Sequence, residues 1–418
     1  MAWMIYTQPV PVSDFEEYRH LAELLLEHHQ LGYPNPSAYR LPGYPAFLAT
    51  LMTLNRSVMW LSFWNIILSS LLTVIVYCLT YHLTSADRRA STLASLVCSV
   101  NPTFVFFAPL LASEHLFAVL LFSGLLLLFS QHIHPVISCT VAGLGLGFAI
   151  LTRGEGVFYV PIFVLAAFLL GKSRIHAFLF PLILAVACVA IVLPWYVRNV
   201  QALGQGAGLS TSAGGNFYYA HNTHGYHQLA ITRFEGLSEV EQQNLGYLSE
   251  VEQQNLGYRL GWEYLIQDPS RILWDVARGT FGLYSPPIDA TAWSTRLPRS
   301  SPSEPWPVKP LPGLKLFDAV AVLFYLGLLV TAMASIRFSR DLTVRAWVLL
   351  AGIIMMNWVC YGVVFLAVTR YRFTAEIVLC ILAGSVLAGL SDSILNLGGV
   401  EISHARCKIG RAEDNPLQ

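Results

Sequence analysis

The stretch RSVMWLSFWNIILSSLLTVIVYCLTYHL, residues 56–83, decides the fold class of this chain. It is long enough to cross a bilayer, because a membrane-spanning helix needs about 20 predominantly apolar residues. Nine segments of this kind occur along the chain: 56–83, 91–110, 115–130, 137–152, 157–171, 177–196, 314–336, 344–369 and 373–391. The sequence therefore predicts an all-α polytopic membrane protein.

The composition of the chain agrees with this class. The 418 residues are 55% hydrophobic and 12% charged, and the mean hydropathy is +0.54. Soluble domains are less apolar and carry more charge. The formal net charge of zero argues against nucleic acid as a partner. Six of the seven cysteines fall inside apolar spans and no CxxC pair occurs, so neither disulfides nor a cysteine metal site is expected.

The apolar spans divide the chain into five consecutive parts. Residues 1–44 are predicted to form a first extracytoplasmic loop, in which HLAELLLEHH (20–29) has the apolar spacing of a helix lying at the membrane interface. The other parts are an N-terminal transmembrane bundle (45–197), a large extracytoplasmic loop (198–313), C-terminal transmembrane helices (314–392) and a cytoplasmic tail (393–418).

The charges of the loops favour an exterior N-terminus. With the long loop left out, this orientation puts ten Lys and Arg residues in cytoplasmic segments and six in exterior ones, as the positive-inside rule prefers. An exterior N-terminus needs a preceding span or a cleaved signal, and residues 1–13 are too short for either. We therefore expect one further helix upstream of Met1; the alternative is a short tail that crosses the membrane by itself.

One undecapeptide, LSEVEQQNLGY, occurs twice in tandem, at 237–247 and 248–258. Eleven residues are close to three helical turns, so a helix accepts such an insertion with its apolar face shifted by only about 20°. Two copies are too few for a repeat architecture. We interpret the pair as a local duplication without chemical meaning.

Ionisable residues gather at the exterior ends of the predicted spans, whereas the centres of the spans are nearly free of charge. The group consists of Asp14, Glu16, Glu17, Arg40, Glu114, Arg153, Glu155, Arg198, Arg370 and Arg372, with Tyr371 between the last two arginines. Arginine binds phosphate through a planar fork, and a carboxylate can deprotonate a hydroxyl group. The pattern favours an enzyme that acts on an anionic lipid headgroup over a transporter, whose charges lie near the bilayer midplane.

The order of motifs resembles the GT-C superfamily of membrane glycosyltransferases, in particular the bacterial dolichyl-phosphate-mannose-protein-mannosyltransferase-like enzymes and the lipid A aminoarabinose transferase. The matching motifs are SDFEEY (13–18), AYRLPGYPAFLA (38–49), NPTFVFFAPLLASEHLF (101–117), GLGLGFAILTRGEG (143–156), LPWYVRN (193–199), STSAGGNFYYAHN (210–222) and TRYRFTAEIVLCILAG (369–384). Together they extend over most of the chain except the duplicated region and the tail. The chain departs from the family in lacking its first transmembrane helix.

The resemblance implies transfer of a sugar from a polyprenyl-phosphate donor to a protein, lipid or glycan acceptor, at the extracytoplasmic face of the plasma or inner membrane. Asp14 matches the family's first-loop acid and Glu114 its second-loop acid, which implies catalytic roles. Donor phosphate is expected to contact Arg40, Arg153, Arg370, Tyr371 and Arg372, and weaker substrate-binding candidates are Tyr18, Tyr44, Arg198 and Asn216.

A divalent cation is a possible cofactor. The segment HNTHGYH carries His221, His224 and His227 and has the composition of a metal site, and relatives in the superfamily sometimes bind such an ion. Loop histidines are more often solvated, so no metal ligand is assigned.

Other interpretations stay open at this point. Asp14 also suits a helix N-terminus, Glu114 suits the start of the third span, and Arg153 and Arg370 suit snorkelling at an interface. As whole-protein alternatives we keep a lipid-linked polysaccharide ligase, a flippase or transporter, and an inactive homologue truncated at its N-terminus.

Overall fold

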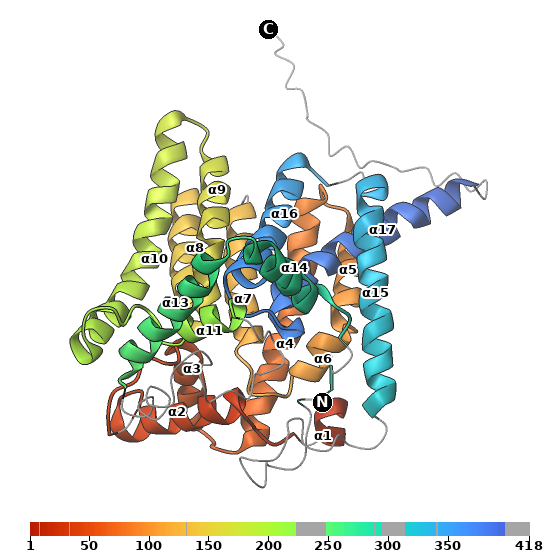
Figure 1. Cartoon of the computed structure of the whole chain (residues 1–418). Coiled ribbons are helices and arrows are strands. Elements are labelled where there is room, and N and C mark those ends of the chain that lie inside the picture. The colour runs from red at the N-terminus through yellow and green to blue at the C-terminus, as the bar shows by residue number, and fades with distance from the viewer. Residues whose placement is uncertain are drawn as a thin grey trace.

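The computed structural model describes residues 1–397 except 8, 33, 131, 223–247, 288–289, 292, 294–313 and 340–341, with side chains described up to residue 391. Helices dominate the described residues, which contain no strand (Figure 1). In chain order the elements are α1 (Ala2–Thr7), α2 (Asp14–His28), α3 (Gly43–Met52), α4 (Val58–Leu83), α5 (Arg88–Ser99), α6 (Pro102–Phe107), α7 (Glu114–Phe129), α8 (Pro135–Thr152), η1 (Gly154–Tyr159), α9 (Val160–Leu170), α10 (Arg174–Leu203), α11 (Ala213–Ala220), α13 (Glu250–Gln267), α14 (Arg271–Tyr284), α15 (Leu314–Phe338), α16 (Val344–Trp358), η4 (Val359–Val364), η5 (Thr369–Arg372) and α17 (Phe373–Leu397).

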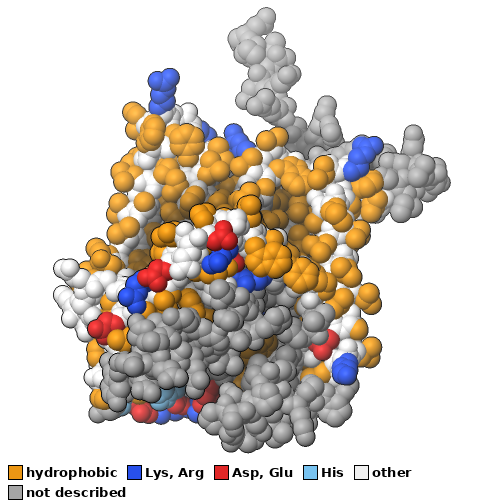
Figure 2. Space-filling view, viewed as in Figure 1, with side chains coloured by type: hydrophobic (Ala, Val, Ile, Leu, Met, Phe, Trp, Pro, Cys, Tyr) orange, Lys and Arg blue, Asp and Glu red, His pale blue; other side chains and the backbone are white. Residues whose placement is uncertain are grey.

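The long helices confirm a multi-pass membrane protein. Among the described residues, six helical segments are long and apolar enough to cross a membrane: Val58–Leu83, Pro135–Thr152, Arg174–Leu203, Leu314–Phe338, Val344–Val364 and Thr369–Ser391. Two shorter apolar helical segments, Glu114–Phe129 and Gly154–Leu170, accompany them. Figure 2 shows hydrophobic side chains over the outer surfaces of α10 and α15, as expected for helices that face lipid.

The continuous span predicted for residues 91–110 is wrong. The structure divides this segment into α5, which ends at Ser99, and α6, which begins at Pro102. Proline has no N–H group and its ring blocks continuation of the preceding helix. The side chain of Asn101 starts the new helix by accepting a hydrogen bond from Thr103 N at 2.9 Å. Its Nδ2 group also donates to Glu376 Oε2 in α17 at 3.0 Å, which fixes the break inside the bundle.

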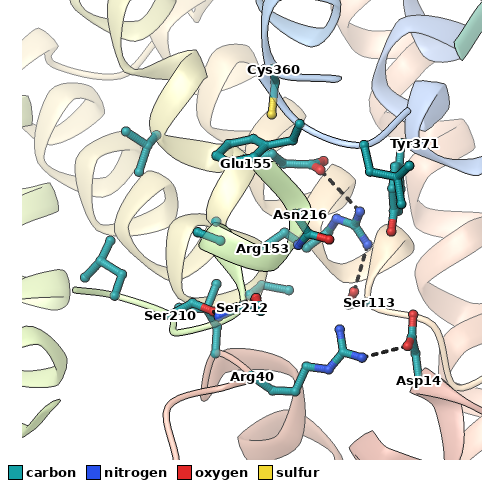
Figure 3. Close-up of a pocket in the computed structure, with 18 of the residues that line it drawn as sticks. Asp14, Arg40, Ser113, Arg153, Glu155, Ser210, Ser212, Asn216, Cys360 and Tyr371 are labelled. Atoms are coloured by element: carbon teal, nitrogen blue, oxygen red, sulfur yellow. Dashed lines mark hydrogen bonds and ion pairs between the residues drawn. The ribbon is translucent and has the colours of Figure 1, made fainter. Parts of the chain in front are cut away.

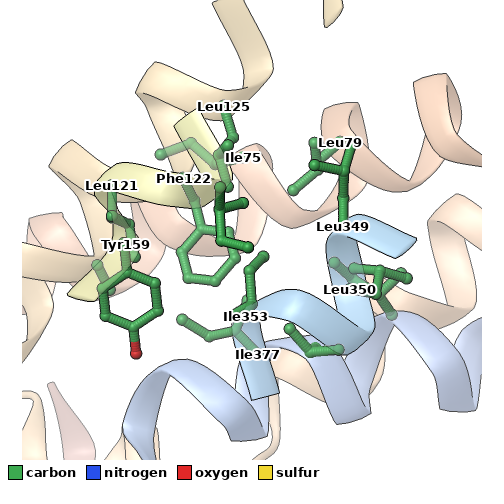
Figure 4. Close-up of a cluster of buried hydrophobic side chains, with 14 of the residues drawn as sticks. Ile75, Leu79, Leu121, Phe122, Leu125, Tyr159, Leu349, Leu350, Ile353 and Ile377 are labelled. Carbon is green, nitrogen blue, oxygen red and sulfur yellow. The ribbon is translucent and has the colours of Figure 1, made fainter. Parts of the chain in front are cut away.

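The core of the bundle joins helices that are distant in sequence. Helix α8 packs against α7 and α10, α17 packs against α5 and α15, and α4 packs against α5 and α7. Figure 4 shows the buried side chains at the centre, among them Ile75, Leu79, Leu121, Phe122, Leu125, Tyr159, Leu349, Leu350, Ile353 and Ile377. In a membrane, close van der Waals packing of this kind holds helices together, because lipid is as apolar as the side chains.

Helix α2 lies crosswise at one end of this bundle, beside α3 (Figure 1). The helix predicted within residues 20–29 is therefore confirmed, although it begins earlier, at Asp14. Phe15 and Ala22 form its buried face and pack with Leu48 of α3 in a second hydrophobic cluster. This packing holds the acidic first turn of α2 against the ends of α7 and α8, where the pocket described below is found.

Candidate active site

A cavity of about 410 Å³ lies where the first turn of α2, the end of α8 and the segment before α17 meet (Figure 3). Most of the residues predicted for the site line it: Asp14, Tyr18, Arg40, Glu114, Arg153, Asn216, Arg370 and Tyr371. The acidic and basic side chains among its lining residues are Asp14, Glu114 and Glu155 on one side and Arg40, Arg153 and Arg370 on the other.

Asp14 stands between two arginines. Arg40 Nη2 binds Asp14 Oδ1 at 2.6 Å, and Arg370 Nη2 binds Asp14 Oδ2. Arg40 also binds Glu17, one helical turn further along α2, with Nε at 2.8 Å from Glu17 Oε2. Ser13, the residue before the helix, makes no side-chain capping bond, and the carboxylate of Asp14 is directed to the arginines.

The two arginines set the charge state of Asp14. Burial by itself would raise the pKa of this carboxyl group, but Arg370 and then Arg40 lower it by more. The pKa of Asp14 is therefore held well below its ordinary value of 3.8, and the group is ionised at neutral pH. Conversely, burial opposes the charge of Arg40, whereas the adjacent Tyr18 and Asp14 favour it, and the pKa of Arg40 is raised.

Arg153 forms the second charged centre of the pocket. Its Nη1 group lies 2.8 Å from Glu114 Oε1 and donates to Ser113 Oγ at 3.1 Å. Its Nη2 group binds Glu155 Oε2 at 3.2 Å. The side chain of Arg153 is 12% exposed and those of both glutamates are 4% exposed, so the cluster is largely shielded from solvent. Figure 3 shows Arg153 held between Glu155 and Ser113.

Aromatic rings surround these arginines. The rings of Tyr361 and Tyr371 stack with their centroids 4.6 Å apart. The guanidinium group of Arg370 lies 5.1 Å from the ring centroids of both Trp293 and Tyr371, and that of Arg153 lies 5.5 Å from Tyr371. Such stacking orients a guanidinium plane while leaving its edge available for hydrogen bonds.

The structure places Tyr44, Arg198 and Arg372 outside the lining of the pocket. Tyr44 is fully buried, and its hydroxyl group accepts a hydrogen bond from Asn65 Nδ2 at 2.8 Å. Arg198 lies over the ring of Trp195 and donates to the carbonyl oxygen of Ser37 at 2.9 Å. Both side chains therefore contact other parts of the chain and do not line the cavity.

The structure places Arg372 apart from the other arginines that were predicted for the site. Its side chain is 1% exposed, and its Nε atom binds Glu376 Oε1 at 2.6 Å. Its Nη1 group donates to the carbonyl oxygens of Leu283 at 3.1 Å and Ser285 at 2.5 Å. The short 3-10 helix η5 turns Arg370 and Arg372 to different sides, because residues two apart on a helix do not share a face.

Several pocket residues were given no individual role from the sequence. Glu155 belongs to the charged group at the exterior ends of the predicted spans, and this position is itself a signal that could have assigned it to the site. Tyr39 is adjacent to the predicted Arg40. Tyr361 lies within an apolar run and has no such signal, since its hydroxyl group reaches Arg153 Nη2, at 3.3 Å, only in the folded chain.

In the described part of the chain, the carboxylates of the pocket are not arranged to hold a metal ion. Asp14 and Glu114 each bind arginine, and within the described part of the chain no group of three or more His, Cys, Asp or Glu side chains is arranged as a metal site. His221 is buried with its Nδ1 atom 3.0 Å from Asp275 Oδ2. His224 and His227 lie outside the described residues.

The fold itself has solved counterparts. The chain superposes on the apo crystal structure of the oligosaccharyltransferase from Archaeoglobus fulgidus with a TM-score of 0.52 and 14% identity, covering 94% of this chain and 48% of that one. The complex of that enzyme, AglB, with an inhibitory peptide and a dolichol-phosphate gives a TM-score of 0.50, with 14% identity and the same coverage. ArnT from Cupriavidus metallidurans bound to undecaprenyl phosphate gives 0.44, with 13% identity, 95% of this chain and 77% of that one.

The two superpositions on the archaeal enzyme show that the chain shares its fold, which is the all-α membrane fold that the sequence predicts. The chain spans about half the length of the archaeal oligosaccharyltransferase. No protein-family model matches the chain, and no curated protein matches it by sequence.

Proposed function

We propose that this protein is a membrane glycosyltransferase that transfers a sugar from a polyprenyl-phosphate donor to a protein, lipid or glycan acceptor. One observation carries the proposal: Arg40 and Arg370 converge on the carboxylate of Asp14 inside a pocket at one end of the helical bundle. The fold supports it, because the archaeal oligosaccharyltransferase with the same fold has been solved with a dolichol-phosphate.

Arg40 and Arg370 are the residues that we assign to the donor phosphate. Both side chains line the cavity, so a ligand inside it can contact them. Their guanidinium forks suit the oxygens of a phosphate, and both charges sit where the leaving group develops its negative charge. Both Nη groups of Arg153 already bind carboxylates, so we assign it the positioning of Glu114.

The reaction that suits this arrangement is a single inverting displacement. An acceptor hydroxyl or amine attacks the anomeric carbon, and a bond from carbon to the acceptor atom forms. The bond between the anomeric carbon and the phosphate oxygen breaks, and its electron pair leaves with the polyprenyl phosphate. The acceptor proton passes to the carboxylate of Asp14. Glu114, fixed by Arg153 Nη1 at 2.8 Å, orients the acceptor beside it.

Donor binding also prepares Asp14 for this role. In the free protein, Arg370 and Arg40 hold the pKa of Asp14 low, which makes it a weak base. A phosphate that binds these arginines supplies a competing negative charge and raises the pKa of Asp14 towards its ordinary value. Proton transfer from the acceptor is thereby linked to the presence of the donor.

The membrane decides where the two substrates lie relative to the site. The carrier tail lies in the bilayer beside the long helices, and the acceptor approaches from the aqueous side. The loop charges support an extracytoplasmic site in the plasma or inner membrane. No step of this mechanism passes through a metal ion.

The test uses membranes that contain the full chain and a panel of polyprenyl-phosphate sugars labelled in the sugar. The expected result is a labelled protein, lipid or glycan product with wild-type protein and at least about a hundredfold less product with Asp14→Asn. The same vesicles separate the alternatives. Movement of label across the bilayer without a new glycosidic bond would refute the transferase and identify a flippase, whereas a product that carries a whole oligosaccharide would identify a ligase.

A further inference from the structure

The second copy of the duplicated undecapeptide, residues 248–258, forms part of the pocket wall. It begins α13, and two of its residues, Gln254 and Tyr258, line the cavity. Gln254 Nε2 donates to the carbonyl oxygen of Gly206 at 2.9 Å, which ties the copy to the segment before α11. The position of this copy is therefore part of the geometry of the site.

Glu250, near the start of this copy, accepts three hydrogen bonds from two other segments. Ser37 Oγ donates to Glu250 Oε1 at 2.5 Å, and the backbone N–H of Ala38 donates to Oε2 at 3.0 Å. Thr211 Oγ1 donates to the same Oε2 atom at 2.9 Å. One carboxylate thus joins the segment before Arg40 to the segment before α11. We call this set of contacts, made by Glu250 with Ser37, Ala38 and Thr211, the joint.

The joint is reinforced by backbone contacts around it. The N–H group of Thr211 donates to the carbonyl oxygen of Ala38 at 3.0 Å, and Ser210 Oγ donates to that of Tyr39 at 2.9 Å. Arg198 holds the same segment from α10 through the carbonyl oxygen of Ser37. Arg40 follows two residues after Ala38, so its approach to the pocket depends on this joint.

A close contact between backbones fixes the register of the copy. A Cβ atom on Gly257 would lie 2.5 Å from the carbonyl oxygen of Gly214 in α11. A Cβ atom on Gly214 would lie 1.9 Å from the carbonyl oxygen of Gln254. Glycine at both positions lets α11 and α13 touch, and this contact places Glu250 at the joint.

We propose that Glu250 is a positioning residue that holds Arg40 in its place for the donor phosphate. The proposal rests on the proposed function for its ligand, but the joint is a structural statement of its own. The duplication supplies a matched control, because Glu239 occupies the same place in the first copy and has identical neighbours in sequence. The first copy lies outside the described residues.

The experiment compares Glu250→Ala with Glu239→Ala in the full chain in detergent micelles. Hydrogen exchange of the Ala38 amide reports the joint, and titration with undecaprenyl phosphate reports the arginine site. For Glu250→Ala we expect exchange at Ala38 to rise about tenfold and the Kd for undecaprenyl phosphate to rise about tenfold. Both quantities should stay within about twofold of wild type in Glu239→Ala, because Glu250 in the second copy keeps its contacts with Ser37, Ala38 and Thr211.

Two further variants separate positioning from general loss of structure. Glu250→Gln keeps an acceptor for the Ala38 amide and a donor for Ser37 Oγ, so it should restore most of the affinity. Deletion of one eleven-residue copy leaves a single complete undecapeptide and should preserve both readouts.

Three results would overturn the proposal: equal effects of Glu239→Ala and Glu250→Ala, no effect of Glu250→Ala, or a defect that appears only when Glu239 and Glu250 are both replaced by alanine. The last would mean that either copy serves at the joint. Failure of undecaprenyl phosphate to bind wild-type protein would refute the donor site, whereas the contrast in exchange at Ala38 would still decide the role of Glu250.

Discussion

Asp14 and Arg370 form an ion pair although 356 residues separate them along the chain, with Arg370 Nη2 donating to Asp14 Oδ2. The pair connects the first turn of α2 to the segment that precedes α17. Arg40 binds the other oxygen of the same carboxylate at 2.6 Å. The pocket is thus held together by ion pairs that join residues near the start of the chain to a residue far along it.

Replacement of Asp14 by asparagine tests its role as the general base. The amide keeps the shape of the side chain but cannot take a proton from the acceptor. Transfer from a labelled polyprenyl-phosphate sugar should fall by about 10²–10⁴-fold, the usual contribution of a general base. The measurement is product formed per unit of folded protein, so that a change in expression is not counted as a change in rate.

The matched control for this variant is Glu16→Gln. Glu16 belongs to the same first turn of α2, but it is exposed and does not line the pocket. Both substitutions remove one negative charge from the same helix N-terminus, which alters the interaction with the helix dipole equally. Unchanged transfer in Asp14→Asn, or an equal loss in Glu16→Gln, would contradict the assignment of Asp14.

The lowered pKa of Asp14 predicts a specific dependence of stability on pH. Burial raises this pKa, but Arg370 and Arg40 lower it by more, so the folded state holds its proton less tightly than the unfolded chain. The resulting stabilisation is complete above the ordinary value of 3.8 and is lost as the pH falls through the lower pKa of the folded state. The gap in thermal midpoint between wild type and Asp14→Asn should be constant from neutral pH to about pH 5 and narrow below about pH 4. If the gap in thermal midpoint widened on acidification, the pKa of Asp14 would be raised on folding, which would contradict this prediction.

Arg153→Met should destabilise the protein strongly. It leaves the carboxylates of Glu114 and Glu155, each 4% exposed, without their cation. Removal of one partner from a buried ion pair costs about 3–5 kcal/mol. Glu114→Gln is the control, because Arg153 then keeps Glu155 and a hydrogen bond to the new amide. Thermal unfolding in detergent should rank wild type first, Glu114→Gln second and Arg153→Met last, and a reversal of the two variants would refute this account of the cluster.

The fold was predictable from sequence wherever apolar length alone decides the structure. Long spans such as 56–83 need no partner to become helical, because the bilayer forbids unsatisfied backbone groups. Apolar length did not predict the break between α5 and α6. The sequence does carry a signal for it, because Asn101 followed by Pro102 is typical of the start of a new helix. Hydropathy averages over such residues, and an apolar window conceals a single proline.

The site was predictable only in part, for a different reason. Asp14 and Arg370 stand out because charge beside a membrane is costly wherever it occurs. Sequence cannot show which neighbour satisfies each charge, and this decides that Arg372 binds Glu376 instead of facing the cavity. Glu250 was not predicted for the same reason, since it accepts three hydrogen bonds from segments far apart in the chain.

Gly279→Ala should disturb the pocket from a distance. Gly279 of α14 touches η4, and a Cβ atom there would lie 2.5 Å from the carbonyl oxygen of Gly362. Since η4 carries Cys360 and Tyr361 of the pocket wall, we expect a loss of about 1–3 kcal/mol in stability together with weaker transfer. Gly327→Ala in α15 is the control, because nothing lies within 4 Å of its Cβ position. Alanine favours a helix at both sites, so opposite effects on the thermal midpoint isolate the contact with Gly362.

The neighbouring arginines Arg370 and Arg372 should respond to the same substitution in different ways. Arg370→Met removes a guanidinium group that faces the cavity, so the Kd for undecaprenyl phosphate should rise about tenfold or more. The thermal midpoint should fall less than in Arg372→Met, because Arg40 still binds Asp14. Arg372→Met instead leaves the fully buried Glu376 without its cation and should cost about 3–5 kcal/mol of stability. Titration of the folded fraction should then give a Kd within about twofold of wild type, since Arg372 does not line the pocket. Equal weakening of binding in the two variants would place Arg372 at the ligand and contradict the division that the structure makes between them.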